Sequence, residues 1–244
     1  MVQGDLMNKP CRFLLAALVC AALASTRGDA GDKKNLAATP TNRDGDRHQQ
    51  FLKIAKKGGV DVLFLGDSIT HGWEGKEPQK IWKKYFEPLK AANFGINGDW
   101  TGHVLWRLTE GDELKGITPK VVVLMIGTYN SGRDSSEQIA AGITLIVKTI
   151  HKKSPTTKVL LLGVFPRNKD ANAPIRKKLA NVNTIIAKLD DGGKTIKYLD
   201  IGEKFLEKDG SLSKDIMPDA LHPSARGYEI WAEAITPTLK EMLK

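Results

Sequence analysis

Two short stretches near opposite ends of the chain carry the residue types of nucleophilic catalysis. Ser68 follows an apolar run and a Gly-Asp pair in "VLFLGDSITHGW", and His222 lies in "PDALHPS", three residues after Asp219. A serine nucleophile needs a base that takes its proton and a carboxylate that orients the base. In a turn, a spacing of three residues puts the carboxylate within reach of the imidazole Nδ1. We therefore expect Ser68 to be the nucleophile, His222 the base and Asp219 its partner.

Each stretch also has a purely structural interpretation. Polar residues after a strand often serve only to cap the next helix, and Asp-x-x-His-Pro can be a capping turn. The other four histidines of the chain fit catalysis less well. His48 and His151 lie on polar helical stretches and are expected to be solvated, and His103 is expected to pack. His71 belongs to the helix that starts at Ser68 and should point away from its hydroxyl.

The elements that position these residues follow from the hydrophobic pattern. Apolar runs predict strands at 60–66, 91–96, 120–127, 158–165 and 195–201. Amphipathic stretches predict helices at 47–57, 77–90, 99–108, 134–152, 173–190 and 224–243. Nearly continuous Val/Leu/Ile runs are typical of strands covered on both faces, and their alternation with helices predicts a parallel sheet in a three-layer α/β/α sandwich. Ligands of such sheets lie beyond the carboxyl ends of the strands, where Ser68, Gly98 and residues 128–131 are expected.

The first 30 residues have the pattern of a secretory signal peptide. Lys9 and Arg12 precede the apolar run 13–24, and small residues allow cleavage after Ala24 or Ala30. An uncleaved membrane anchor is the alternative, but 12 apolar residues are short for a span, which takes about 20. We expect an exported protein, periplasmic or secreted, with no membrane span after cleavage.

The rest of the chain is expected to be a flexible arm at 31–46 and one domain at 47–244. Its two cysteines, Cys11 and Cys20, both lie in the predicted signal peptide, which excludes thiol chemistry and Cys-metal sites in the mature chain. The predicted site has one histidine and one aspartate, His222 and Asp219, and both already take part in the serine mechanism. We therefore expect neither a metal site nor another cofactor. The formal net charge of +9 comes from scattered lysines without a nucleic-acid motif, so nucleic acid is not an expected partner.

Four ordered blocks resemble those of the SGNH/GDSL hydrolases: "GDSIT", "NFGINGDWTGHVLWRL", "PKVVVLMIGTYNSG" and "DALHP". The second and third are most similar to the catalytic-subunit type of platelet-activating-factor acetylhydrolase and its exported bacterial relatives. The resemblance spans residues 60–244 and implies a flavodoxin-like domain with a shallow site. It also implies that the oxyanion is held by the N–H groups of Ser68 and Gly98 and by a side-chain amide of the third block.

The third block departs from the family pattern at the oxyanion residue. Where the family has asparagine, this chain has Tyr129, followed by Asn130. Three arrangements are open: the Tyr129 phenol donates, Asn130 substitutes, or the two backbone N–H groups act alone. In the last case Tyr129 would form an aromatic wall of the site. Asp67 and Tyr129 are the candidate substrate contacts.

These features predict a serine esterase that removes small acyl groups, above all acetyl, from carbohydrates or other small esters. The first alternative is a weakly active or inactive carbohydrate-binding protein of the same fold, because Tyr129 replaces the oxyanion asparagine. The second is an acyltransferase that passes the same acyl group to a sugar hydroxyl. The sequence leaves the oligomeric state open.

Overall fold

The computed structural model of the protein describes residue 1 and residues 35–244. Its sheet has five parallel strands in the order β2-β1-β3-β4-β5. The strands are β1 (Val62–Gly66), β2 (Ala91–Gly95), β3 (Val121–Met125), β4 (Lys158–Leu162) and β5 (Ile196–Leu199). All five predicted strands are present, and the predicted three-layer α/β/α sandwich with a central parallel sheet is confirmed.

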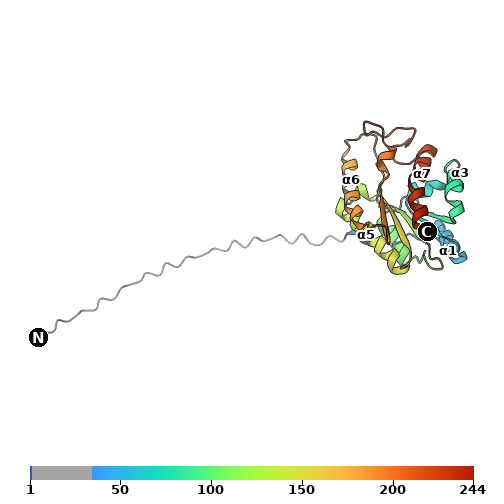
Figure 1. Cartoon of the computed structure of the whole chain (residues 1–244), viewed down its shortest axis with the longest axis horizontal. Coiled ribbons are helices and arrows are strands. Elements are labelled where there is room, and N and C mark those ends of the chain that lie inside the picture. The colour runs from blue at the N-terminus through green and yellow to red at the C-terminus, as the bar shows by residue number, and fades with distance from the viewer. Residues whose placement is uncertain (2–34) are drawn as a thin grey trace. The chain divides into compact units, whose positions relative to one another are not determined.

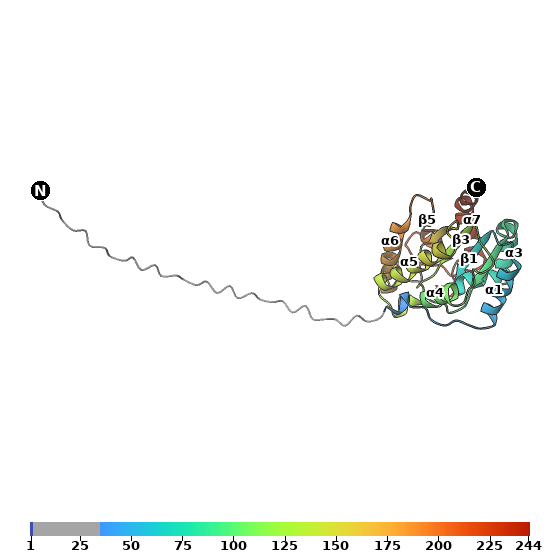
Figure 2. The same cartoon turned by 90° about the horizontal axis from the view of Figure 1, so that it is seen from below.

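Helices cover both faces of the sheet, as predicted. The α-helices are α1 (Asp46–Lys57), α2 (Ser68–His71), α3 (Pro78–Tyr85), α4 (Thr101–Thr109), α5 (Ser136–Lys153), α6 (Pro174–Ile186) and α7 (Ala225–Met242). Short 3₁₀ turns are η1 (Leu36–Ala38), η2 (Gly72–Glu74), η3 (Glu87–Leu89), η4 (Asn130–Gly132), η5 (Ala187–Leu189) and η6 (Gly202–Phe205). Helices α1, α4, α5 and α6 pack on one face, and α3 and α7 pack on the other. Figure 1 shows α5 and α6 on one side of the sheet and α3 and α7 on the other. Figure 2 shows strands β1, β3 and β5 between the α5–α6 side and the α3–α7 side.

The apolar run before Ser68 contributes side chains to the cores on both faces of the sheet. Leu63 and Leu65 belong to the core under α4 and α5, whereas Val62 and Phe64 belong to the core under α3 and α7. All four side chains are fully buried. Burial of a side chain of this size contributes about 1.5–3 kcal/mol, so both layers hold β1 rigidly. The end of β1, where Ser68 follows, is therefore a fixed point of the fold.

The expected flexible arm is wrong for residues 35–45, which pack against the domain. Ala37 is fully buried, and its carbonyl accepts a hydrogen bond from Thr101 Oγ1 at 2.6 Å. Asn35 Nδ2 donates to the Gln138 carbonyl at 3.3 Å. Gly102 and Gly142 explain this close approach, because a Cβ on either would collide with this segment. Residue 46 of the predicted arm begins α1, whereas residues 31–34 of the arm and residues 2–30 of the predicted signal peptide lie outside the described residues.

His48 and His151 are not solvated as expected. His48 is 3% exposed, and its Nδ1 lies 2.8 Å from Glu113 Oε1. His151 is half-buried. The sequence did not reveal the burial of His48 because its partner lies 65 residues further along the chain.

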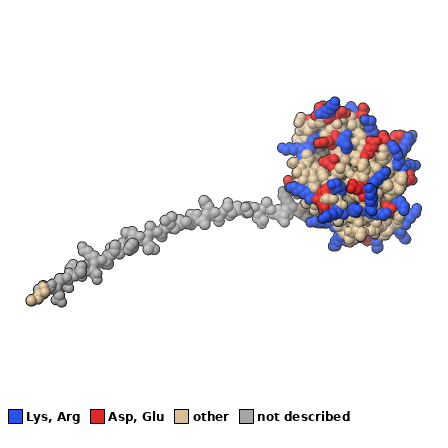
Figure 3. All heavy atoms as spheres, viewed as in Figure 1, with Lys and Arg blue, Asp and Glu red and all other residues tan. Residues whose placement is uncertain are grey.

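Charged side chains of both signs are interspersed over the face of the molecule drawn in Figure 3. This agrees with the scattered lysines seen in the sequence. Within residues 35–244, no helix has both the length and the apolar character that a membrane crossing requires.

Candidate active site

The turn after β1 caps the helix that follows and positions Ser68 at the start of that helix. A Cβ on Gly66 would collide with the Met125 carbonyl and with Thr70, so only glycine fits at the end of this strand. Asp67 is the N-cap of α2, and its Oδ1 accepts a hydrogen bond from the Ile69 N–H at 2.9 Å. Ser68 is thus the first residue of α2 at the carboxyl edge of the sheet.

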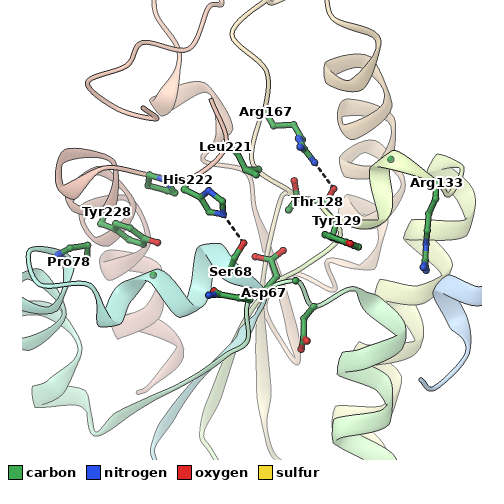
Figure 4. A pocket seen from close by; sticks show the side chains of 16 residues that line it. Asp67, Ser68, Pro78, Thr128, Tyr129, Arg133, Arg167, Leu221, His222 and Tyr228 are labelled. Carbon is green, nitrogen blue, oxygen red and sulfur yellow. Dashed lines mark hydrogen bonds between the residues drawn. The ribbon is translucent and has the colours of Figure 1, made fainter. Parts of the chain in front are cut away.

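Ser68, His222 and Asp219 form one hydrogen-bonded chain, as the sequence predicts. Ser68 Oγ lies 2.9 Å from His222 Nε2, and His222 Nδ1 lies 2.6 Å from Asp219 Oδ2. Figure 4 shows the imidazole reaching across the cavity to the serine. A proton on Nδ1, facing the carboxylate, leaves Nε2 free to accept the Ser68 proton. The three residues therefore have the geometry of a nucleophile, a base and an orienting carboxylate.

The loop between η6 and α7 holds the imidazole in place. Asp219 Oδ1 accepts hydrogen bonds from the N–H groups of His222 and Leu221 at 2.7 and 3.0 Å. Partial burial alone would raise the pKa of Asp219, but its hydrogen bonds to the His222 ring and to these N–H groups hold that pKa below the usual value. Ser224 caps α7 by accepting from the Gly227 N–H, and its own N–H donates to the Ile216 carbonyl. The carboxylate therefore stays ionised beside the imidazole at neutral pH.

Two backbone N–H groups are available to hold an oxyanion. Among the described residues, neither the Ser68 N–H nor the Gly98 N–H has a hydrogen-bond partner. Gly98 has a φ of 77°, which glycine adopts without strain, and it lines the cavity with Ser68. The sequence assigned these two groups to the oxyanion through the family resemblance, and the structure places both at the same cavity.

A buried ion network anchors the turn that carries Gly98. The Asp99 carboxylate is fully buried and lies 2.7 Å from Arg107 Nη1 and 2.6 Å from Arg43 Nε. Burial opposes ionisation of Asp99, but the nearby His103 ring, the charge of Arg107 and the hydrogen bonds from Arg107 and Arg43 hold its pKa below the usual value. Arg43 also donates to the Asn97 carbonyl at 2.9 Å. The position of the Gly98 N–H therefore depends on the core and on the segment at 35–45.

The third sequence block has two candidate oxyanion donors, Tyr129 and Asn130. Tyr129 lies at the cavity, whereas Asn130 lies in the core. Asn130 is fully buried: its Oδ1 accepts from the Thr101 N–H at 3.0 Å, and its Nδ2 donates to Thr101 Oγ1 and to Asp134 Oδ2. The prediction of Asn130 as an oxyanion donor is wrong, because this amide is committed to the start of α4. Tyr129 lines the cavity with 58% of its surface exposed, and its hydroxyl meets no hydrogen-bond partner in residues 35–244.

Asp67 has an unusual electrostatic setting. It is 1% exposed and lines the cavity. Burial is the largest cause that raises the pKa of Asp67, the nearby Asp99 adds to it, and the Ile69 N–H and Arg167 oppose it. The resulting pKa is about 7, so the neutral and ionised forms are both accessible near neutral pH.

The cavity around Ser68 is open and has a volume of about 960 Å³. Sequence reasoning missed Arg167, which donates to the Thr128 carbonyl at 3.2 Å and lines the cavity. It also missed Arg133, whose guanidinium lies over the Trp100 ring. Arg167 follows β4 at the carboxyl edge of the sheet, and that position could have indicated it. The remaining contacts come from loops whose approach no local pattern reveals.

The other candidate histidines lie outside this constellation. His71 is on α2 with its Nε2 3.7 Å from Glu74, so it points away from Ser68 as expected. His103 Nδ1 lies 3.5 Å from Asp99 Oδ1, and its ring packs edge-on against Trp100. Within the part of the chain that the structure describes, no three His, Cys, Asp or Glu side chains cluster as metal ligands would.

Comparison with known proteins gives one family and several close relatives. The sequence model of the GDSL-like lipase/acylhydrolase family matches residues 64–230. Subunit alpha2 of platelet-activating factor acetylhydrolase IB from Gallus gallus is 38% identical over 218 residues, which cover 86% of this chain and 93% of that protein. Subunit alpha1 from Homo sapiens is 38% identical over 196 residues, covering 80% and 82%.

Solved structures show the same fold at low sequence identity. A GDSL-like lipase from Bacteroides thetaiotaomicron superposes with a TM-score of 0.64 at 19% identity and covers 80% of this chain and 97% of that chain. A variant of an acetyl xylan esterase from Geobacillus stearothermophilus has a TM-score of 0.56 at 18% identity, with coverage of 76% and 95%.

Proposed function

This chain belongs to the GDSL-like lipase/acylhydrolase family and is an ester hydrolase, and from that premise we propose that it removes acetyl groups from carbohydrates by a serine mechanism. The observation that carries the proposal is the chain from Ser68 Oγ through His222 to Asp219, with distances of 2.9 and 2.6 Å. It opens into a cavity that also holds the two free backbone N–H groups.

In the proposed first half-reaction, Ser68 Oγ bonds to the acyl carbon while its proton moves to His222 Nε2. The carbonyl electron pair shifts onto the oxygen, which accepts hydrogen bonds from the N–H groups of Ser68 and Gly98. When the tetrahedral intermediate collapses, the ester C–O bond breaks and the leaving alkoxide takes the proton from His222. Water then attacks the acyl-enzyme, gives its proton to His222, and Ser68 leaves with that proton.

The walls of the cavity support a sugar as the alcohol part of the ester. Tyr129 presents an exposed ring, and aromatic faces pack well against the apolar faces of sugar rings. Arg133 and Arg167 add hydrogen-bond donors on the same side (Figure 4). The acetyl group is supported by the relatives' names, platelet-activating factor acetylhydrolase and acetyl xylan esterase.

Acetate release tests this proposal. Wild-type protein should hydrolyse p-nitrophenyl acetate and release acetate from at least one acetylated polysaccharide in a panel that includes acetylated xylan. Ser68→Ala should lose both activities while its thermal unfolding midpoint stays within a few degrees of wild type. Wild-type turnover in Ser68→Ala would refute the serine mechanism.

The same experiment separates the alternatives. Tight binding of a polysaccharide without Ser68-dependent acetate release would favour a binding role for Tyr129. Transfer of acetyl to an added sugar acceptor, in preference to water, would favour an acyltransferase.

We also propose that the protein is exported, on the basis of the apolar run 13–24 and the small residues after it. Expression of the full chain in a bacterial host, followed by fractionation and N-terminal sequencing, tests this. Export should yield a mature N-terminus at Ser25 or Gly31, and an intact Met1 in the cytoplasmic fraction would refute it.

A further inference from the structure

One buried oxygen beside the nucleophile has no partner. Asp67 Oδ1 caps the Ile69 N–H, but no donor among residues 35–244 reaches Asp67 Oδ2. Figure 4 shows this carboxylate beside the Ser68 hydroxyl, on the side of Thr128 and Tyr129. Buried polar atoms are almost always hydrogen-bonded, so an unpaired one that lines a cavity points to a ligand. Here the ligand would be the group that reacts with Ser68.

Burial favours the neutral form of Asp67, and the nearby Asp99 charge adds to this effect. Among the described residues, the ionisable side chains that face this region from the neighbouring loops and from α7 include Asp99, Tyr129, Arg167, His222 and Tyr228. Asp99 raises the pKa of Asp67, and its own charge is fixed by Arg107. Arg167 opposes this: its guanidinium donates to the Thr128 carbonyl, and its positive charge favours the ionised form of Asp67. The Tyr228 hydroxyl donates to the Ile69 carbonyl.

We propose that Asp67 is a catalytic residue: its Oδ2 carries a proton in the working enzyme and donates a hydrogen bond to the oxyanion. This inference rests on the proposed serine mechanism. It supplies the third donor that the oxyanion lacks in this chain, because Tyr129 extends to solvent and Asn130 is held in the core. Neutral carboxyl groups held in apolar sites serve as oxyanion donors in other enzymes.

The proton stays on Asp67 throughout the reaction. Ser68 Oγ bonds to the acyl carbon, its proton goes to His222, and the carbonyl electron pair becomes the oxyanion. The Asp67 O–H donates to that oxyanion without transferring its proton. An ionised Asp67 would instead place a second negative charge beside the oxyanion and repel it. The rate should therefore fall as pH rises through about 7, the pKa of Asp67.

Two substitutions separate this role from helix capping. Asparagine and serine both cap the Ile69 N–H, so α2 should stay intact in Asp67→Asn and in Asp67→Ser. The asparagine amide donates a hydrogen bond at every pH, whereas serine leaves nothing at the Oδ2 position. The experiment measures kcat and kcat/KM for phenyl acetate between pH 5 and 9.5 for both variants, wild type and Ser68→Ala, with thermal unfolding of each protein.

The wild type should show an alkaline limb near pH 7. Asp67→Asn should keep the neutral-pH rate within about tenfold and lose the alkaline limb. Asp67→Ser should lose about 10²–10³ in kcat, the usual effect of one missing oxyanion donor.

Three results would overturn the inference: Asp67→Ser within threefold of wild type, Asp67→Asn as slow as Asp67→Ser, or a wild-type alkaline limb that persists in Asp67→Asn. If Ser68-dependent turnover remains in any of these cases, the serine mechanism stands and only the role of Asp67 fails. Absence of Ser68-dependent turnover in the wild type would remove both proposals.

Discussion

Replacing Asp219 with asparagine should slow ester hydrolysis about tenfold to 100-fold without loosening the loop that carries His222. The new amide oxygen can keep the two hydrogen bonds from the N–H groups of His222 and Leu221, at 2.7 and 3.0 Å. Its NH₂ group then faces His222 Nδ1, which carries no proton when it accepts from this amide. The imidazole proton must move to Nε2, where it blocks acceptance of the Ser68 proton.

The size of the effect follows from the cost of turning the amide over. A flipped amide would restore the productive tautomer but lose both backbone hydrogen bonds. Net values of about 0.5–1.5 kcal/mol apply to each, and since the Asp219 side chain is 55% exposed the lower half applies, about 1–2 kcal/mol in all. That preference is about fivefold to thirtyfold at about 1.4 kcal/mol per factor of ten. Loss of the carboxylate charge beside the imidazolium adds at most about fivefold, since an exposed pair contributes about 0.2–1 kcal/mol.

The assay is kcat/KM on p-nitrophenyl acetate at pH 8, with thermal unfolding of each protein. Asp215→Asn is the matched control, because Asp215 is exposed on the same loop and its side chain contacts neither His222 nor Asp219. This control should stay within about twofold of wild type. A loss of less than about threefold in Asp219→Asn would refute the tautomer argument. So would an equal loss in the control.

Other consequences can be tested in the same preparations. Tyr129→Asn should raise turnover on acetyl esters about tenfold at pH 8.5, where Asp67 is mostly ionised, because a short amide adds an oxyanion donor. Tyr129→Phe should change turnover little, and a large loss would show that the phenol donates. Arg107→Met should destabilise the fold by about 3–5 kcal/mol, because it strips the partner from two buried carboxylates. Its melting temperature should fall by about 10 °C, and a shift of under 3 °C would contradict this. Arg43→Met should lower turnover about tenfold with a small change in melting temperature, because Arg43 is 32% exposed yet holds the turn before Asp99. Unchanged turnover would show that the turn holds without it. EDTA should leave activity unchanged, and activity lost to EDTA and restored by zinc would refute the serine mechanism.

The strands and the positions of the catalytic candidates could be predicted because their signals are local. Strands β1 and β3 are buried along their whole length, so their apolar runs are visible without knowledge of their neighbours. Asp219 and His222 lie three residues apart, and Ser68 follows the end of a strand directly. In a parallel sheet all strand ends meet at one edge, so the sequence order already implied that these residues could converge.

Contacts between distant segments were decided only by the tertiary structure. Asn130 and Tyr129 are neighbours in the chain, yet one is buried under Thr101 and the other lies in the cavity. Nothing in their residue types distinguishes these fates, because each depends on how the third block packs against α4. The segment at 35–45 looked like a loose arm because its composition is polar and its partners lie about 60–100 residues away.

At Asp67, one property could be predicted from the sequence and another depends on the tertiary structure. The sequence by itself determined that an aspartate precedes the serine at a strand-to-helix turn, and that it can cap the helix. Only the tertiary structure decided that its second oxygen is buried without a partner beside the nucleophile. The physical reason is that Asp67 lies at a cavity whose other walls come from distant parts of the chain, among them Gly98, Thr128 and Arg167. A carboxyl group's charge depends on that enclosure and on neighbouring charges, which are brought together from distant parts of the chain.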